Sequence, residues 1–256
     1  MGAAMAQVTT SRAERRQPGP SRRWARWTRR LLATAATGIL AVALLIALLW
    51  PLTPSVRGAE DIIAANLDQH HGVDLGTLPS PDKVGLAVVA TEDSRFYAHH
   101  GLDSQGILRA MFGFAHSSQD PGGATLDQQL AKNLYTPHDT TLDKVEQVEL
   151  SFKLEAAYSK PQILEMYLSV VYYGHGFYGL NAAAKGYFGQ QPSTLTWAQA
   201  SLLAGLLQAP SAYDPYTHLV RAKSRQRHVL DRLVAVHTLS AAQADSSYRA
   251  PLALRP

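Results

Sequence analysis

The apolar positions of the chain follow two patterns, which meet near residue 50. No charged residue occurs between Arg30 and Arg57, and most of this run of 26 positions is apolar. About 20 apolar residues are enough to span the hydrocarbon core of a bilayer, so we expect residues 31–50 to form one transmembrane helix. From residue 59 onward, apolar residues recur mostly at helical spacing, with polar residues between them. The pattern therefore predicts a membrane anchor followed by a helical domain.

The same pattern sets the expected domain organisation. Residues 1–30 have the Arg-, Ser- and Pro-containing composition of a disordered tail, and residues 51–58, with two prolines and a glycine, indicate a linker. No strong alternating run indicates a large sheet. We therefore expect residues 59–256 to form one mostly α-helical domain. The expected helices cover residues 59–67, 82–92, 103–116, 124–134, 141–158, 160–172, 178–187, 196–207 and 218–235.

Particular residues mark where some of these helices should begin and pack. Asp103, Thr141 and Thr196 are suited to N-cap positions, and Pro161 suits the first turn of a helix. One stripe of helix 141–158 is expected to be buried, and it consists of Leu142, Val145, Val148, Phe152, Leu154 and Ala156.

The distribution of charge supports the anchor. Residues 1–30 carry eight arginines and one acid, Glu14, within a chain of net charge +4. Arginines on one flank of an apolar segment predict a cytoplasmic N-terminus and a translocated domain. A basic tail can also bind nucleic acid, but beside this apolar run it indicates orientation and attraction to anionic lipids, so we expect no nucleic-acid partner. A cleaved signal peptide is disfavoured, because the apolar run is long and residues 51–54 make a poor cleavage site.

Two segments carry candidate chemistry. The apolar sequence LAVVA leads directly into Glu92 and Asp93, and a carboxylate at the end of an apolar helix can be partly desolvated, which suits it to proton transfer near neutral pH. In residues 122–135, Gln129 and Lys132 are three positions apart and therefore neighbours on a helix. Amide donors beside an ammonium can bind a diphosphate. Taken alone, each segment is better explained as a solvated helix end or face, since carboxylates are rarely buried.

A third segment, residues 142–189, is rich in tyrosines and small residues at helical spacing. Such residues usually pack in a core. The polar exceptions that could instead face a cleft are Lys144, Gln147, Lys153 and Lys160.

Together these segments resemble the signatures of the family-51 peptidoglycan glycosyltransferases, which occur as monofunctional transglycosylases and as the first domain of bifunctional penicillin-binding proteins. The resemblance covers about residues 60–235, with the motifs in the family's order and spacing. The matching motifs are Glu92-Asp93-x-x-Phe96-x-x-His99-x-Gly101, Gly122-Gly123-Ala124-Thr125-Leu126-x-Gln128-Gln129-Leu130-x-Lys132-Asn133-Leu134, Tyr158-Ser159-Lys160, Ile163-Leu164-Glu165-x-Tyr167-Leu168 and Leu203-Ala204-Gly205-Leu206-x-Gln208-Ala209-Pro210.

The resemblance implies a lysozyme-like helical fold and the polymerisation of lipid II into glycan strands. Glu92 matches the general base that deprotonates the 4-hydroxyl of lipid II, while the lipid diphosphate of the growing strand leaves. Gln129, Lys132 and Lys144 match positions that bind the diphosphate. The further residues that the resemblance places at the substrate are Asp93, Phe96, His99, Thr125, Asn133, Gln147 and Lys160.

The resemblance also implies a location and partners. The protein would be a single-pass protein of the bacterial cytoplasmic (inner) membrane with an extracytoplasmic catalytic domain. Its partners would be lipid II, the lipid-linked glycan strand, the bilayer, transpeptidases and other cell wall synthesis proteins. No cofactor is required, although Mg²⁺ or Mn²⁺ can assist. The chain has no cysteine and shows no dedicated cluster of metal ligands in its sequence.

Several positions depart from the family pattern. Asp143 stands where the family has arginine, and Gln147 stands where it has its second essential carboxylate. The serine and threonine positions of the second motif hold Ala124 and Asp127, and Ser169 replaces an asparagine. An amide keeps the shape of a carboxylate but loses its charge and proton chemistry.

These departures leave two hypotheses open. The chain is a lipid II polymerase that works through Glu92, or a catalytically weakened member that acts as a binding or scaffold subunit of the cell wall machinery. Glu146 or Glu149 could replace the lost carboxylate only if their helix were rotated, since they lie about 100° and 200° from Gln147. A glycan-cleaving enzyme is a weaker third reading, because hydrolysis has no use for a diphosphate site.

Overall fold

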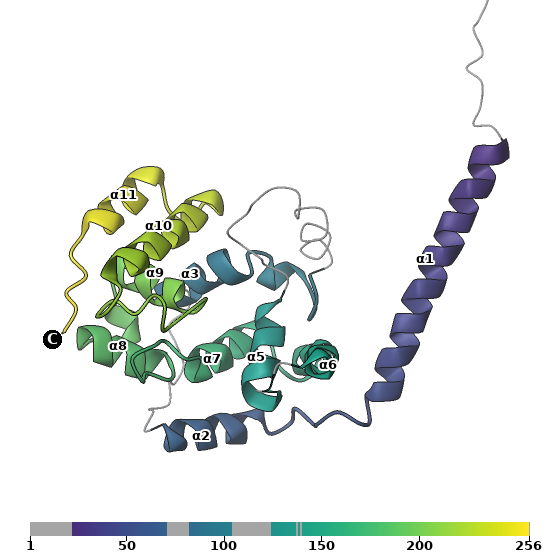
Figure 1. The fold of residues 1–256 in the computed structure, drawn as a ribbon, viewed down its shortest axis with the longest axis horizontal. Helices are drawn as coiled ribbons and strands as arrows, with labels where there is room; N and C mark the ends of the chain where they lie inside the picture. The colour runs from purple at the N-terminus through teal and green to yellow at the C-terminus, as the bar shows by residue number, and fades with distance from the viewer. Residues whose placement is uncertain (1–21, 71–81, 104–123, 137, 139, 256) are drawn as a thin grey trace, which may run out of the picture. The chain divides into compact units, whose positions relative to one another are not determined.

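The structure is a computed structural model that describes residues 22–70, 82–103, 124–136, 138 and 140–255 (Figure 1). Two compact units divide the chain, Met1–Trp50 and Pro51–Pro256. The first contains helix α1 (Arg22–Leu49). Judged by length and hydropathy together, no helix among the described residues qualifies as a membrane span. The transmembrane helix over residues 31–50 thus stays a prediction from the sequence.

The second unit is helical, as the sequence predicts. Within its described residues there are no strands, and β-pairing is confined to two isolated bridges, His100 with Leu102 and Tyr172 with Tyr178. Its elements in chain order are α2 (Ala59–Gln69), α3 (Lys83–Glu92), the 3₁₀ turn η1 (Phe96–Ala98), α5 (Leu126–Tyr135), α6 (Thr141–Ala157), α7 (Lys160–Val170), α8 (Leu180–Phe188), η2 (Pro192–Thr194), α9 (Trp197–Leu206), α10 (Leu219–Ala235) and α11 (Ala241–Arg249).

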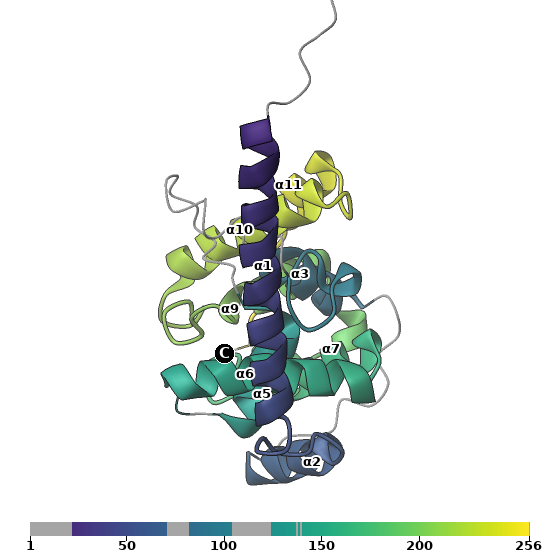
Figure 2. The same cartoon turned by 90° about the vertical axis from the view of Figure 1, so that its right-hand side faces the viewer.

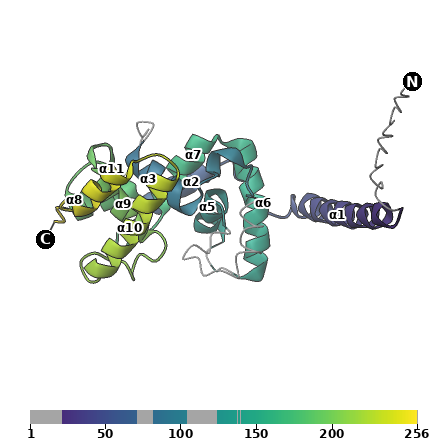
Figure 3. The ribbon, with the colours of Figure 1, turned by 90° about the horizontal axis from the view of Figure 1, so that it is seen from above.

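Helices α3 and α9 form the centre of this unit. Every residue of α9 from Ala198 to Leu206 is buried, as expected for a helix that is apolar on all sides. Helix α10 packs against both α9 and α3 (Figures 1 and 2). Within the unit, α6 lies at one end and α8 and α11 at the other (Figure 3). Helix α3 therefore packs against both α9 and α10.

Capping residues fix where the helices begin. Capping boxes are formed by Thr125, Thr140, Thr196 and Ser240. In each box the hydroxyl accepts a hydrogen bond from the backbone N–H of the third helical residue, and the side chain of that residue accepts one from the backbone N–H of the capping residue. The predicted cap at Thr196 is confirmed, and Pro161 lies in the first turn of α7 as expected. The cap of α6 is Thr140, one residue before the predicted Thr141.

Of the predicted buried stripe of α6, only Leu154 is fully buried, so most of that prediction is wrong. Leu142 and Val145 are 81% and 41% exposed, and the helix instead buries Gln147, Glu149 and Lys153 beside Leu150 and Leu154. The polar side chains of this face make hydrogen bonds and an ion pair with the protein, which makes their burial tolerable. Helix 103–116 falls almost wholly outside the described residues.

Candidate active site

Glu92 is the last residue of α3, a helix whose other residues are mostly buried. Asp82 caps the start of the helix by accepting a hydrogen bond from the Gly85 N–H at 2.9 Å. The side chain of Glu92 is 16% exposed. The fold therefore presents one carboxylate at the end of an apolar helix, partly shielded from solvent, as the sequence predicts.

An amide and a phenol orient this carboxylate. Gln129 on α5 donates from Nε2 to Glu92 Oε2 at 3.3 Å. The Tyr167 hydroxyl on α7 donates to Gln129 Oε1 at 2.9 Å. Burial, with a smaller contribution from the Glu92 charge, raises the pKa of Tyr167 well above its ordinary value, so the phenol keeps its proton. With its oxygen held by Tyr167, the Gln129 amide must present its nitrogen to Glu92.

An arginine that the sequence analysis did not single out also faces the carboxylate. Arg225 Nη2 on α10 lies 3.7 Å from Glu92 Oε1, and the arginine side chain is 7% exposed. A signal for it exists in the sequence. Arg225 lies in the apolar stripe formed by Ala222, Val229 and Leu233, all buried, where helical periodicity calls for an apolar residue.

Four predicted substrate-binding residues are enclosed by protein. The Asp93 carboxylate accepts from His99 Nε2 at 2.8 Å and from the Leu126 N–H at 3.1 Å. The Thr125 hydroxyl donates to the Gly101 carbonyl at 2.8 Å and caps α5. Phe96 is fully buried. These bonds of Asp93, His99 and Thr125 join the segment after α3 to the start of α5.

Lys160 is engaged by two carboxylates. Its ammonium lies 3.1 and 3.2 Å from the two oxygens of Asp127, forms an ion pair with Glu155, and lies 4.2 Å from the centre of the Phe96 ring. Burial raises the pKa of Asp127 to about 6, although the Lys160 charge opposes the rise. The Glu155 carboxyl has a lowered pKa: burial raises it, but the Lys160 hydrogen bond and charge outweigh that effect. In this arrangement Lys160 neutralises buried carboxylates of the protein.

Among the described residues, the fold brings together one group of candidate metal ligands. Ligand atoms of Asp93, His99 and Asp127 lie within 4.8 Å of one another, and all three residues are buried. This group is not recognisable from sequence spacing, because its members come from different segments. Their donor atoms are already used, since His99 bonds Asp93 and Lys160 bonds Asp127. A cation here would have to compete with the Lys160 ammonium for the Asp127 oxygens, so these three residues are poorly suited to hold a metal ion.

The remaining predicted contacts lie on α5 and α6. Lys132 is half-buried, while Asn133 and Lys144 are exposed. Gln147 is 8% exposed and donates from Nε2 to the Thr136 hydroxyl at 3.0 Å. Contact of these residues with a substrate stays a prediction.

One departure from the family pattern, Asp143, has a local structural explanation, and the surroundings of Glu149 bear on another, Gln147. Asp143 completes the capping box of α6, with its Oδ2 accepting from the Thr140 N–H at 2.7 Å. Glu149 is 1% exposed, pairs with Lys153 at 3.9 Å and accepts from the Thr53 hydroxyl at 2.7 Å. Glu149 is thus bonded to the linker and to Lys153, and it does not replace the carboxylate missing at Gln147.

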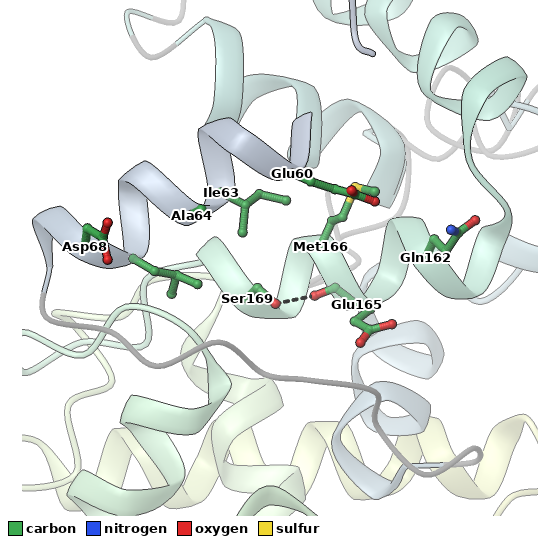
Figure 4. A pocket seen from close by; sticks show the side chains of 9 residues that line it. Glu60, Ile63, Ala64, Asp68, Gln162, Glu165, Met166 and Ser169 are labelled. Carbon is green, nitrogen blue, oxygen red and sulfur yellow. Dashed lines mark hydrogen bonds between the residues drawn. The ribbon is translucent and has the colours of Figure 1, made fainter. Parts of the chain in front are cut away.

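A separate pocket of about 420 Å³ lies between α2 and α7 (Figure 4). Its lining includes the apolar side chains of Ile63 and Met166 and the carboxylates of Glu60, Asp68 and Glu165. None of the predicted site residues lines this pocket. Ser169, which replaces the expected asparagine, lines it too, and its hydroxyl donates to the Glu165 carbonyl at 2.8 Å.

The chain is similar to known transglycosylases and penicillin-binding proteins. A putative transglycosylase from Cupriavidus necator is 35% identical over 235 residues, which cover 91% of this chain and 99% of the relative. Penicillin-binding protein 2D of Bacillus subtilis is 40% identical over 66% of this chain and 25% of its own length. Penicillin-binding protein 1A of Neisseria gonorrhoeae is 40% identical over 65% of this chain and 21% of its own length. The chain thus spans about a quarter of these two penicillin-binding proteins.

A crystal structure of penicillin-binding protein 1A from Haemophilus influenzae overlaps 38% of this chain and 14% of its own, at 34% identity and a TM-score of 0.36. That overlap is too small to support a conclusion about the fold. The family model described as Transglycosylase, in contrast, matches residues 61–234. The chain therefore belongs to the transglycosylase family, the family-51 glycosyltransferases that also form a domain of class A penicillin-binding proteins, and it is a glycosyltransferase.

Proposed function

We propose that the protein polymerises lipid II into peptidoglycan glycan strands, with Glu92 as the general base. The observation that carries the proposal is the environment of Glu92, which ends a buried helix and is held by Gln129 and faced by Arg225. A carboxylate that is oriented and partly desolvated is suited to take a proton from a hydroxyl.

In the proposed reaction, Glu92 removes the proton of the lipid II 4-hydroxyl as that oxygen attacks the anomeric carbon of the growing strand. The bond to the lipid diphosphate breaks, and the anomeric centre inverts from α to β. General base catalysis of this kind typically contributes ~10²–10⁴-fold in rate. Lys132 and Lys144, on α5 and α6, supply positive charge for the leaving diphosphate. The reaction needs no cofactor.

Membrane attachment completes the proposal. Residues 31–50 would anchor the protein in the bacterial cytoplasmic membrane, with the N-terminus inside and the catalytic domain outside. The uncharged run after Arg30 and the arginines before it support this topology. A substrate attached to a lipid is confined to the same bilayer, so an anchor keeps enzyme and substrate together. Transpeptidases and other cell wall synthesis proteins are the proposed partners.

The experiment that tests the proposal is polymerisation of lipid II by the purified full-length protein in detergent, read as glycan-strand length on a gel. Glu92→Gln should abolish the strands, because the amide cannot accept the proton. Glu60→Gln is the matched control, since it makes the same change at an exposed position on α2 and should leave strand length unaltered. Strands of normal length and yield from Glu92→Gln would refute the role of this base.

The second candidate function is that of a weakened member acting as a scaffold, and it is favoured by Gln147. Its amide is hydrogen-bonded to Thr136, and a carboxylate at the same place could accept a bond from that hydroxyl instead. Gln147→Glu should therefore fit without disruption. If the parent makes no strands and Gln147→Glu makes them, the parent is a polymerase disabled at its second carboxylate, and the scaffold role gains support.

A further inference from the structure

Two arginines of helix α10 contact the last turn of α3, the helix that carries the proposed base Glu92. Arg225 Nη2 lies 3.7 Å from Glu92 Oε1, and Arg232 Nε donates to the Ala90 carbonyl at 3.2 Å. The two arginines are seven positions apart, so they project from nearly the same face of α10, two turns from each other. One contacts the carboxylate and the other a backbone carbonyl of the last turn of α3.

The end of α3 is an unfavourable place for an anion. The carbonyl groups at the C-terminus of a helix carry partial negative charge, which opposes a carboxylate in the last turn. Glu92 occupies that turn and is largely shielded from water. Cations beside the carboxylate and the free carbonyls offset this cost, and guanidinium groups remain charged even where they are buried.

The packing of α10 against α9 fixes the position of Arg225. Gly205 on α9 lies opposite, and a Cβ atom there would come within 3.1 Å of Arg225 Cγ. The next residue of α10, Gln226, is fully buried and donates to the Ala198 carbonyl of α9 at 2.6 Å. Helix α10 is thus fixed to α9 on one side and reaches α3 on the other.

We propose that Arg225 is a positioning residue that holds the Glu92 carboxylate ionised and aimed for proton abstraction. This inference rests on the proposed function of Glu92. The described contacts of its carboxylate come from Arg225 on α10 and Gln129 on α5, with the Tyr167 phenol of α7 behind the amide. Arg225 is the cation among these three groups.

The kinetic test uses Arg225→Gln and Arg225→Lys in the full-length protein, with lipid II as substrate. Arg225→Gln should lower kcat by about 10²-fold, as expected when a reacting group is misplaced, with KM little changed. Its activity should also need higher pH, because the carboxylate loses a stabilising cation. Arg225→Lys should recover part of kcat. The matched control is Arg227→Gln on the outer side of α10, where Arg227 pairs with Asp231 and Asp245.

A second measurement separates this inference from the proposed function. Carbon-13 NMR of protein labelled at glutamate carboxyls follows the titration of Glu92 without turnover, with the signal assigned by its loss in Glu92→Gln. In Arg225→Gln the titration of Glu92 should move to higher pH, and in Arg227→Gln it should not move. Absence of strands from the parent would defeat the proposed function alone. An unmoved Glu92 titration in folded Arg225→Gln, or an equal loss of kcat in Arg227→Gln, would overturn the positioning role.

Discussion

The hydroxyl of Tyr167 donates a hydrogen bond of 2.9 Å to the side-chain oxygen of Gln129. This bond decides which end of the amide faces Glu92, since an amide whose oxygen is held must offer its nitrogen on the other side. A neutral phenol and a neutral amide thus orient the proposed base, and neither changes its protonation in the working pH range. A phenol is protonated at neutral pH in any case, and burial raises the pKa of Tyr167 further.

Tyr167→Phe should therefore lower activity while the fold persists. The ring still fills its buried site, but the Gln129 oxygen loses its donor and the amide can turn. Leaving one buried polar atom unsatisfied should cost about 1–3 kcal/mol of stability. Strand synthesis should fall with the change concentrated in kcat. Tyr173→Phe is the control, because Tyr173 is also fully buried but makes no described contact with Gln129. Equal effects of the two changes on kcat would contradict the role of the Tyr167 hydroxyl.

The Asp127–Lys160 pair predicts a dependence of stability on pH. The pKa of Asp127 rises from 3.8 to about 6 in the folded protein, with burial as the main cause. A carboxyl with a raised folded pKa stabilises the fold fully below the unfolded value, and this stabilisation is lost as the pH rises through about 6. Between pH 4 and 7.5 the loss should be about 2 kcal/mol.

Asp127→Asn should remove this loss. Urea unfolding of the parent and the variant at pH 4, 5, 6 and 7.5 gives the difference directly. Glu155 has the opposite effect on stability, since its pKa is lowered in the folded protein. Its contribution to stability changes mainly below its unfolded pKa of 4.5. The change of stability above pH 5 is therefore assigned to Asp127. Parallel stability curves for parent and variant above pH 5 would show that Asp127 does not titrate there.

Asp143 should matter more for stability than for binding. It occupies a position where the family has arginine, and its carboxylate caps α6 together with Thr140. Asp143→Ala and Thr140→Ala should each destabilise the protein by about 1 kcal/mol. Because both break the same capping box, the double variant should lose less than the sum. Additive losses in urea unfolding would indicate that the box contributes nothing as a unit.

The sequence predicts much of the fold because apolar periodicity and capping residues act locally. Helices α9 and α10 lie within a residue or two of their expected bounds, and Thr196 caps α9 as expected. Helix α11 was missed because, among its residues, only Ala244 is buried, so no apolar stripe marks it.

Parts of the site could not be predicted, because they depend on tertiary contacts. Glu92 was identified from its place after an apolar run. Arg225 lies more than 130 positions later, and only the packing of α10 on α3 brings it to Glu92. The burial of Glu149 and Lys153 in α6 likewise depends on Thr53, about 100 positions earlier. The burial of a polar side chain cannot be predicted from the local sequence when its hydrogen-bond partners lie far away in the chain.

The contact between α6 and the linker gives the last prediction. The Lys153 ammonium donates to the Thr53 carbonyl at 3.0 Å, to the Thr53 hydroxyl at 2.6 Å and to the Pro54 carbonyl at 3.2 Å. It also lies 3.9 Å from Glu149, which is 1% exposed. Lys153→Met keeps the length of the side chain but leaves Glu149 buried without its cation. Breaking a buried pair in this way should cost about 3–5 kcal/mol.

The double variant Lys153→Met with Glu149→Leu should recover most of that loss, because an apolar pair of similar volume replaces the ion pair without a buried charge. Urea unfolding of the parent, both single variants and the double variant completes the cycle. The double variant should still release the linker, since residues 53 and 54 lose their donor, and limited proteolysis near residue 53 should become faster. If the double variant is as unstable as Lys153→Met, the contact with Thr53 and Pro54, rather than the unpaired Glu149 charge, is what Lys153 contributes to stability.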